Sequence, residues 1–133
     1  QVRRAVEALA DDRMLSAYLF GSHAEGRAHQ DSDVDVGILL DRETLPTPRQ
    51  RFAYGTLLAS RLMERLATGV DLVILNDLPP TFARRIVLDG VRVLCADPEA
   101  DHAFVRDVQL RAADLEPFLR QKRAVKLDAL ARS

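Results

Sequence analysis

A short segment near the N-terminus constrains this chain more than any other. The apolar run over residues 15–20 is typical of a strand, and it ends at Gly21, which permits a tight turn because it has no side chain. Ser22 follows at a predicted helix start, where free backbone N–H groups and the helix dipole favour an anion such as phosphate. The segment therefore predicts a strand, a turn and a phosphate-binding helix start in direct succession.

Two carboxylates stand on the next predicted strand, residues 34–40. Asp33 and Asp35 are two positions apart at its start, and side chains at i and i+2 of a strand point to the same face. Adjacent carboxylates repel each other unless a cation lies between them. Because Mg²⁺ binds through one or two carboxylates together with substrate phosphates, the pair predicts a magnesium site. A magnesium site beside a phosphate site is the requirement of phosphoryl or nucleotidyl transfer.

A third acid, Asp71, interrupts the apolar run of a later predicted strand, residues 70–75. A charged residue there is unexpected unless the strand lies at a sheet edge or the charge has a partner. If this strand pairs beside the 34–40 strand, Asp71 joins Asp33 and Asp35 and is placed to act as a general base. The alternative reading of each acid is a solvated side chain at a strand end.

The remaining pattern alternates helices with short strands. Helices are expected over residues 2–12, 49–67 (closed by Gly69) and 81–89, and a fourth strand over 91–95. This order predicts an α+β fold (α/β mixed), in which helices pack on a small mixed β-sheet. We expect residues 1–96 to form the core and residues 97–133 to form a C-terminal helical extension of the same domain, in which Pro117 ends or kinks a helix.

Composition excludes several classes of protein. A length of 133 residues fits one domain, and a formal net charge of -1 argues against a dedicated nucleic-acid binder. No run of about 18 apolar residues is present to span a membrane, and the first residues do not resemble a signal peptide. The single Cys95 cannot form an internal disulfide, and no Cys/His cluster suggests zinc. We therefore expect a cytoplasmic protein without membrane association or stable nucleic-acid binding.

The run from Gly21 to Asp35, GSHAEGRAHQDSDVD, resembles a known pattern. It matches G-S-x-A-x-G-x(5)-S-D-x-D of the DNA polymerase β-like nucleotidyltransferase superfamily, and it is most similar to the minimal nucleotidyltransferase (MNT) branch. The resemblance extends over residues 15–96, including the helix–Gly–strand segment of residues 86–94. It implies the polymerase β-like nucleotidyltransferase fold for this chain.

The resemblance also implies roles for individual residues. Gly21 and Ser22 would hold the β- and γ-phosphates of a nucleoside triphosphate. The Asp33 and Asp35 pair would bind two Mg²⁺ ions, and Asp71 would complete the catalytic and metal-binding set.

One part of the motif departs from the family pattern. Many relatives have basic residues in the turn, giving G-S-R-A-R-G, whereas His23 and Glu25 occupy those positions here. Glu25 places a negative charge near the triphosphate. We expect Arg27 to compensate from the next turn as a nucleotide-binding residue.

MNT proteins commonly accompany a HEPN-domain ribonuclease, and the resemblance implies that this chain is the antitoxin of such a toxin–antitoxin pair. The resemblance implies that it transfers AMP from ATP to a tyrosine hydroxyl of the toxin, with Mg²⁺ as cofactor. Two alternatives stay open: a non-catalytic antitoxin that neutralises its partner by binding, and a small-molecule nucleotidyltransferase. The amphipathic, basic segment over residues 117–131 is either a solvated helix face or a surface for the protein partner.

Overall fold

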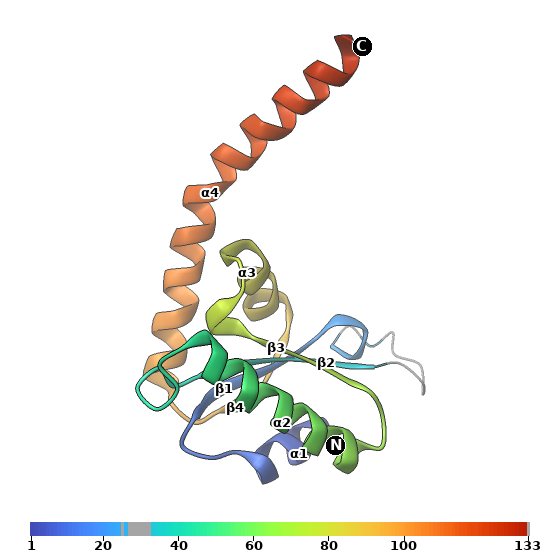
Figure 1. Ribbon diagram of the computed structural model, residues 1–133, viewed down its shortest axis with the longest axis vertical. Coiled ribbons are helices and arrows are strands. Elements are labelled where there is room, and N and C mark those ends of the chain that lie inside the picture. The colour runs from blue at the N-terminus through green and yellow to red at the C-terminus, as the bar shows by residue number, and fades with distance from the viewer. Residues whose placement is uncertain (25, 27–32, 133) are drawn as a thin grey trace.

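A computed structural model describes residues 1–24, 26 and 33–132 of the chain, and Figure 1 shows their arrangement. The elements in these ranges are α1 (Val2–Leu9), β1 (Met14–Phe20), η1 (Gly21–His23), β2 (Val34–Leu40), α2 (Pro48–Leu66), β3 (Val70–Ile74), η2 (Leu75–Asp77), α3 (Pro80–Asp89), β4 (Val91–Cys95) and α4 (Pro98–Arg132). The predicted order of helices and strands is confirmed, and most boundaries lie within a residue or two of those expected. The two η elements are single turns of 3₁₀ helix.

The strands form one mixed sheet in the order β3-β2-β1-β4. β1 is antiparallel to both β2 and β4, whereas β2 and β3 are parallel. Parallel neighbours require a crossover connection, and α2 provides it between β2 and β3. The predicted α+β class with a small mixed sheet is therefore confirmed.

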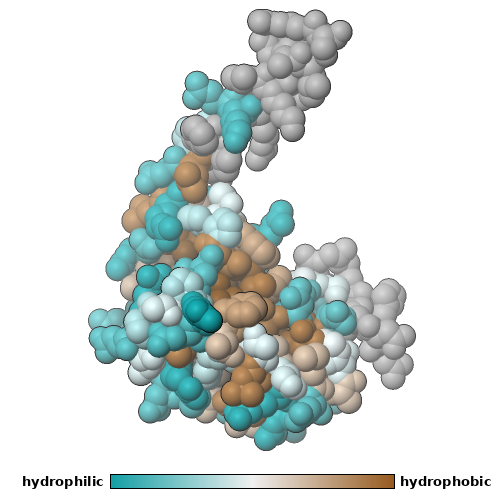
Figure 2. All heavy atoms as spheres, in the orientation of Figure 1, coloured by the Kyte–Doolittle hydropathy of each residue, from teal (hydrophilic) through white to brown (hydrophobic). Residues whose placement is uncertain are grey.

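The helices cover the two faces of this sheet as two layers. Figure 1 shows α1 and α2 on one side, with α3 and the first half of α4 on the other. The core divides in the same way, because alternate residues of a strand point to opposite faces. Ala17, Val36 and Ile38 pack with α1 and α2, and Tyr18 and Leu39 pack with α3 and α4. Figure 2 shows apolar residues gathered over α3 and the adjoining part of α4.

α2 begins and ends at well-defined caps. Thr47 Oγ1 accepts a hydrogen bond from the Gln50 N–H at 3.1 Å, and Gln50 Oε1 accepts one from the Thr47 N–H at 3.0 Å. This reciprocal capping box satisfies two donors that a helix start leaves unpaired. The helix closes at Ala67, which is left-handed with φ 54°. The prediction that Gly69 closes this helix is therefore wrong, and Gly69 has a different role at the functional site.

α4 is a single helix that continues through Pro117. The prediction that Pro117 ends the helix is wrong, and the alternative, a kink, agrees with Figure 1, where the axis of α4 changes direction about halfway along. A proline removes one backbone hydrogen bond and forces the axis to bend, but the helix resumes on the far side. The second half of α4 extends beyond the sheet (Figure 1).

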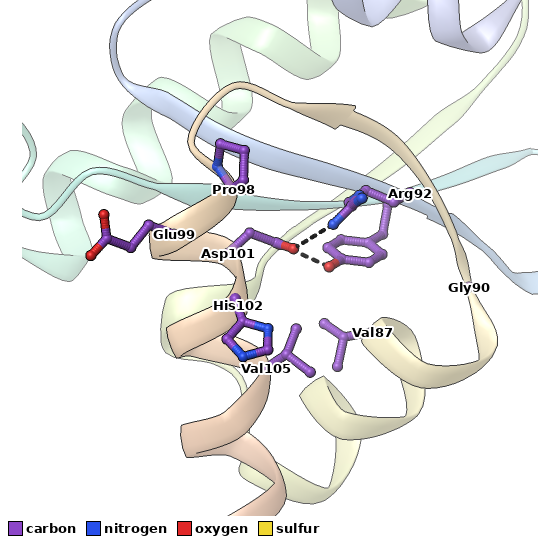
Figure 3. A pocket seen from close by; sticks show the side chains of 9 residues that line it. Val87, Gly90, Arg92, Pro98, Glu99, Asp101, His102 and Val105 are labelled. Atoms are coloured by element: carbon purple, nitrogen blue, oxygen red, sulfur yellow. Dashed lines mark hydrogen bonds and ion pairs between the residues drawn. The ribbon is translucent and has the colours of Figure 1, made fainter.

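Hydrogen bonds to a buried carboxylate, that of Asp101, join the start of α4 to the sheet. Tyr18 on β1 donates its hydroxyl proton to Oδ1 of Asp101 at 2.8 Å, and Arg92 on β4 donates from Nη1 to Oδ2 at 3.0 Å. Figure 3 shows the Asp101 side chain, near the start of α4, pointing toward Arg92 on β4. Asp101 is only 2% exposed, so its charge depends on both donors. Burial, followed by the Asp101 hydrogen bond, raises the pKa of Tyr18 far above its usual value.

No helix in the described part of the chain is both long enough and apolar enough to cross a membrane.

This network gives a stability prediction. Replacing Tyr18 with Phe removes one donor from a buried carboxylate, and we expect the free energy of unfolding to fall by about 2 kcal/mol. Urea denaturation monitored by circular dichroism measures the loss. Arg111→Gln is the matched control, because it breaks an exposed pair with Asp107 on α4, which we expect to cost at most about 0.5 kcal/mol. Equal losses in the two variants would contradict the stabilising role of the network.

Candidate functional site

The predicted turn at Gly21 lies directly against the first acid of β2. Phe20, the last residue of β1, is paired with Asp35, and Gly21 has φ +71°. L-residues rarely adopt this conformation. A Cβ atom on Gly21 would also overlap the carboxylate of Asp35. The backbone conformation and the approach of the carboxylate both favour glycine at this position.

The parallel pairing of β2 and β3 places the third acid, Asp71, beside Asp35. Asp35 and Asp71 are paired residues in the register of the two strands. Neighbouring strands lie about 4.8 Å apart, and paired side chains stand on the same face of the sheet. The condition set by the sequence, that the Asp71 strand must lie beside the strand that follows Asp33, is therefore met.

Asp33 lies just before β2, where a second glycine makes room for it. The Val34 N–H donates to the Gly69 carbonyl oxygen at 2.9 Å. A Cβ atom on Gly69 would overlap the Asp33 carboxylate. Gly69, which the sequence pattern placed at the end of α2, therefore leaves space for an acid of the candidate site.

The three acids differ in exposure, and their charges act on one another. Asp35 is half-buried, whereas Asp33 and Asp71 are exposed. Burial raises the pKa of Asp35, the negative charges of Asp71 and Asp33 raise it further, and His23 on the turn acts in the opposite direction. The ionised form of Asp35 is thus disfavoured in the folded chain, and a bound cation would relieve this repulsion.

Oxygen donors of this kind suit Mg²⁺ by type. Among the residues that the structure describes, however, no three His, Cys, Asp or Glu side chains gather closely enough to enclose a metal ion. The fit therefore rests on the donor type and on the repulsion at Asp35. Binding of a metal would have to draw the carboxylates of Asp33, Asp35 and Asp71 together.

The predicted phosphate-binding helix start is shorter than expected. Ser22 is half-buried in η1, a 3₁₀ turn of three residues that the Ala24 N–H closes by donating to the Gly21 carbonyl oxygen. A single turn carries little of the dipole of a full α-helix, so the helix-dipole part of the prediction is wrong. What the turn offers to a phosphate is its backbone N–H groups and the Ser22 hydroxyl. Arg27, the predicted compensating cation, lies outside the described residues.

A pocket of about 390 Å³ adjoins this turn. It is lined by residues of the β1 end, η1 and α3: Phe20, Gly21, Ala24, Phe82, Arg85, Ile86, Asp89 and Gly90. The α3 wall of this pocket was not predicted from the sequence, in which residues 81–89 indicate only a helix. No sequence signal marks Phe82 or Arg85, since only tertiary packing places α3 beside the turn.

Comparisons with known proteins relate this chain to a protein family. The profile of the family described as "Polymerase beta, Nucleotidyltransferase" matches residues 6–99. A comparison with curated protein sequences found no significant match.

Solved structures share the whole fold. A chain from a toxin–antitoxin complex with AMP-PNP is 22% identical with a TM-score of 0.65, over 96% of this chain and 94% of that one. A chain from a complex of the tri-AMPylated Shewanella oneidensis HEPN toxin with its MNT antitoxin is 20% identical with a TM-score of 0.63, over 98% and 96% of the two chains. A chain from the MntA–HepT toxin–antitoxin complex is 19% identical with a TM-score of 0.59, over 96% and 92%. At these identities the likeness shows a common fold.

The contact between Gly21 and Asp35 gives a second prediction. We expect Gly21→Ala to lower the free energy of unfolding by about 3 kcal/mol, because it combines backbone strain with steric overlap. Gly26→Ala is a matched control, since Gly26 has φ +72° with nothing within 4 Å of a built Cβ. That variant should show the strain alone, about 1 kcal/mol. Chemical denaturation of both variants measures the difference, and equal losses would show that the overlap with Asp35 is harmless.

The raised pKa of Asp35 gives a third prediction. The folded chain binds the Asp35 proton more tightly than the unfolded chain, so this residue lowers stability as the pH rises above the usual Asp value of 3.8 and through the raised pKa. With a chelator present, Asp35→Asn should be more stable than the native sequence at pH 7, and the advantage should shrink towards pH 4.

Urea denaturation at the two pH values measures this advantage. Asp114→Asn, which removes an exposed acid on α4, is the control for loss of one negative charge. An advantage of Asp35→Asn that is the same at both pH values would contradict the role of Asp35 ionisation.

Proposed function

Because the chain belongs to the family described as "Polymerase beta, Nucleotidyltransferase", we propose that it transfers AMP from ATP to a hydroxyl of a partner protein. The proposed partner is a HEPN ribonuclease toxin, the proposed acceptor is a tyrosine, and this chain acts as the antitoxin. The proposal rests on one observation: the Gly21 turn lies against Asp35, and Asp35 is paired with Asp71 on the neighbouring strand.

The proposed reaction assigns a role to each part of this site. Gly21 and Ser22 hold the diphosphate that leaves. Asp33, Asp35 and Asp71 would hold Mg²⁺, which when bound supplies positive charge that stabilises the attacking and leaving oxygens. Arg27 is proposed to add a further contact to the nucleotide.

Transfer of AMP to the acceptor hydroxyl needs no reactant other than ATP and the acceptor. The acceptor oxygen bonds to the α-phosphorus of ATP while the bond from that phosphorus to the bridging oxygen breaks, and pyrophosphate leaves. Asp71 takes the hydroxyl proton as general base. Its exposure supports this role, because an exposed carboxylate at a sheet edge is accessible to an acceptor carried by a separate macromolecule.

The similar structures support the choice of partner. One contains a HEPN toxin that carries AMP groups in complex with its MNT antitoxin, and another is a toxin–antitoxin complex with AMP-PNP. Each shares its fold with this chain over almost the full length of both chains.

A second candidate function is neutralisation of the toxin by binding alone. The observation in its favour is that, in the described ranges, the acids of the site do not gather into a metal-binding cluster. Glu25 in the turn also adds negative charge where relatives have a basic residue.

One experiment separates the two functions. The chain is mixed with its HEPN partner, Mg²⁺ and ATP, and the intact mass of the partner is measured beside its ribonuclease activity. We expect the partner to gain one or more AMP units and lose activity. The Asp33→Ala/Asp35→Ala double variant should add no mass, since catalysis by positioning and charge neutralisation is lost. Parallel trials with the other nucleoside triphosphates identify the donor.

Asp12→Asn is the control, because Asp12 is exposed between α1 and β1 and lies outside the site. It should modify the partner at the native rate. If the double variant inhibits the ribonuclease as well as the native chain does, and no mass is gained in either case, the chain acts by binding.

A further inference from the structure

α3 forms the second wall of the pocket beside the Gly21 turn. Gly21 and Ala24 line one side of this pocket, and Phe82 and Arg85 line the other. The two sides are remote in the sequence but are brought together because α3 packs on the face of the sheet that carries Tyr18 and Leu39.

The turn needs a positive partner for the triphosphate that it is proposed to hold. Many MNT relatives have basic residues at two positions of this turn, which are occupied by His23 and Glu25 in this chain. A cation from another element of the fold would add to the attraction that Arg27 and Mg²⁺ are proposed to provide for a polyanion at this turn.

Arg85 meets this requirement by its position and its surroundings. It is exposed on α3 and lines the same pocket as Gly21. Several other arginines are committed to carboxylates: Arg13 to Asp11, Arg51 to Asp77, Arg92 to Asp101 and Arg111 to Asp107. Arg85 takes part in no ion pair among the described residues, so its five N–H donors are available to a ligand.

The rest of the α3 wall indicates which anion the pocket takes. Phe82 is 38% exposed and contacts Phe20 edge to face, with the ring centroids 6.2 Å apart. It gives the pocket an aromatic wall of the kind on which nucleobases pack. Asp89, one helical turn after Arg85, brings the net charge of this wall to zero. A wall with both charges and an aromatic ring suits a nucleotide, whose ribose and base offer hydrogen-bond donors, better than a simple phosphate ion.

We propose that Arg85 binds the triphosphate of the nucleotide beside the Gly21 turn, and that Phe82 contacts its base. α3 thereby adds a positive charge beside a turn in which Glu25 occupies a position that is basic in many MNT relatives. This inference rests on the proposed function, since it assumes that the turn holds a nucleoside triphosphate.

Equilibrium binding tests the inference without any transfer reaction. Isothermal titration of the isolated chain uses two probes in the presence of Mg²⁺: AMP-PNP, which has a base, and inorganic tripolyphosphate, which has none. We expect Arg85→Gln to lower the affinity of the chain for both probes about tenfold, because it removes a charge-assisted contact. Arg85→Lys should recover part of the affinity. Phe82→Leu should lower the affinity for AMP-PNP by about fivefold and leave the affinity for tripolyphosphate unchanged.

Arg106→Gln is the matched control, because Arg106 is an exposed arginine on α4 that does not line the pocket. It should bind both probes as the native chain does. Urea midpoints equal to that of the native chain confirm that each variant is folded.

One result would overturn the role of Arg85, and a different result would overturn the proposed function. If the native chain binds AMP-PNP and Arg85→Gln binds it equally well, the role of Arg85 is wrong while the proposed function stands. If the native chain binds neither probe, the proposed function itself fails.

Discussion

The close approach of Gly21 to the Asp35 carboxylate is the contact on which the site depends. It exists because Phe20 and Asp35 are paired across β1 and β2. Side chains alternate between the faces of a sheet, so a slip of this register by one residue would turn Asp35 to the opposite face. The register therefore determines whether the turn and the acids meet.

The same register is stabilised from both faces of the sheet. Apolar residues of β1 and β2 pack with α1 and α2 on one side, and Tyr18 and Leu39 pack under α3 and α4 on the other. The buried Asp101 ties β1 and β4 to the start of α4 through two donors. These contacts lie away from the acids, so the site can hold charges that disfavour folding while the sheet keeps its arrangement.

Burial of Asp35 and repulsion from the neighbouring carboxylates lower the stability of the folded chain when Asp35 is ionised. Burial, Asp71 and Asp33 all act against its ionised form. In a chain selected for stability alone, an apolar residue would serve better at this position in the sheet. The proposed Mg²⁺ would offset this repulsion, and α3 contributes a further positive charge, Arg85, to the pocket at the adjoining turn.

Much of this protein was predictable from local pattern. Alternation of apolar runs with Gly and Pro predicted the order of strands and helices. The spacing of Gly21, Ser22, Asp33 and Asp35 predicted a candidate site, in which the structure brings Gly21 and Asp35 together. These signals are local, because they depend on the allowed backbone conformations of a few neighbouring residues. The resemblance of the same run to the MNT pattern indicated the family.

Only the tertiary structure decided the remaining features, because each depends on residues far apart in the chain. The parallel pairing of β2 and β3 placed Asp71 beside Asp35, which the sequence offered only as a condition. Packing also showed that Gly69 makes room for an acid and does not close a helix. The α3 wall followed in the same way, since nothing near Arg85 in the sequence marks it. Sequence determined which groups the protein carries, and the strand register and helix packing determined which of them meet.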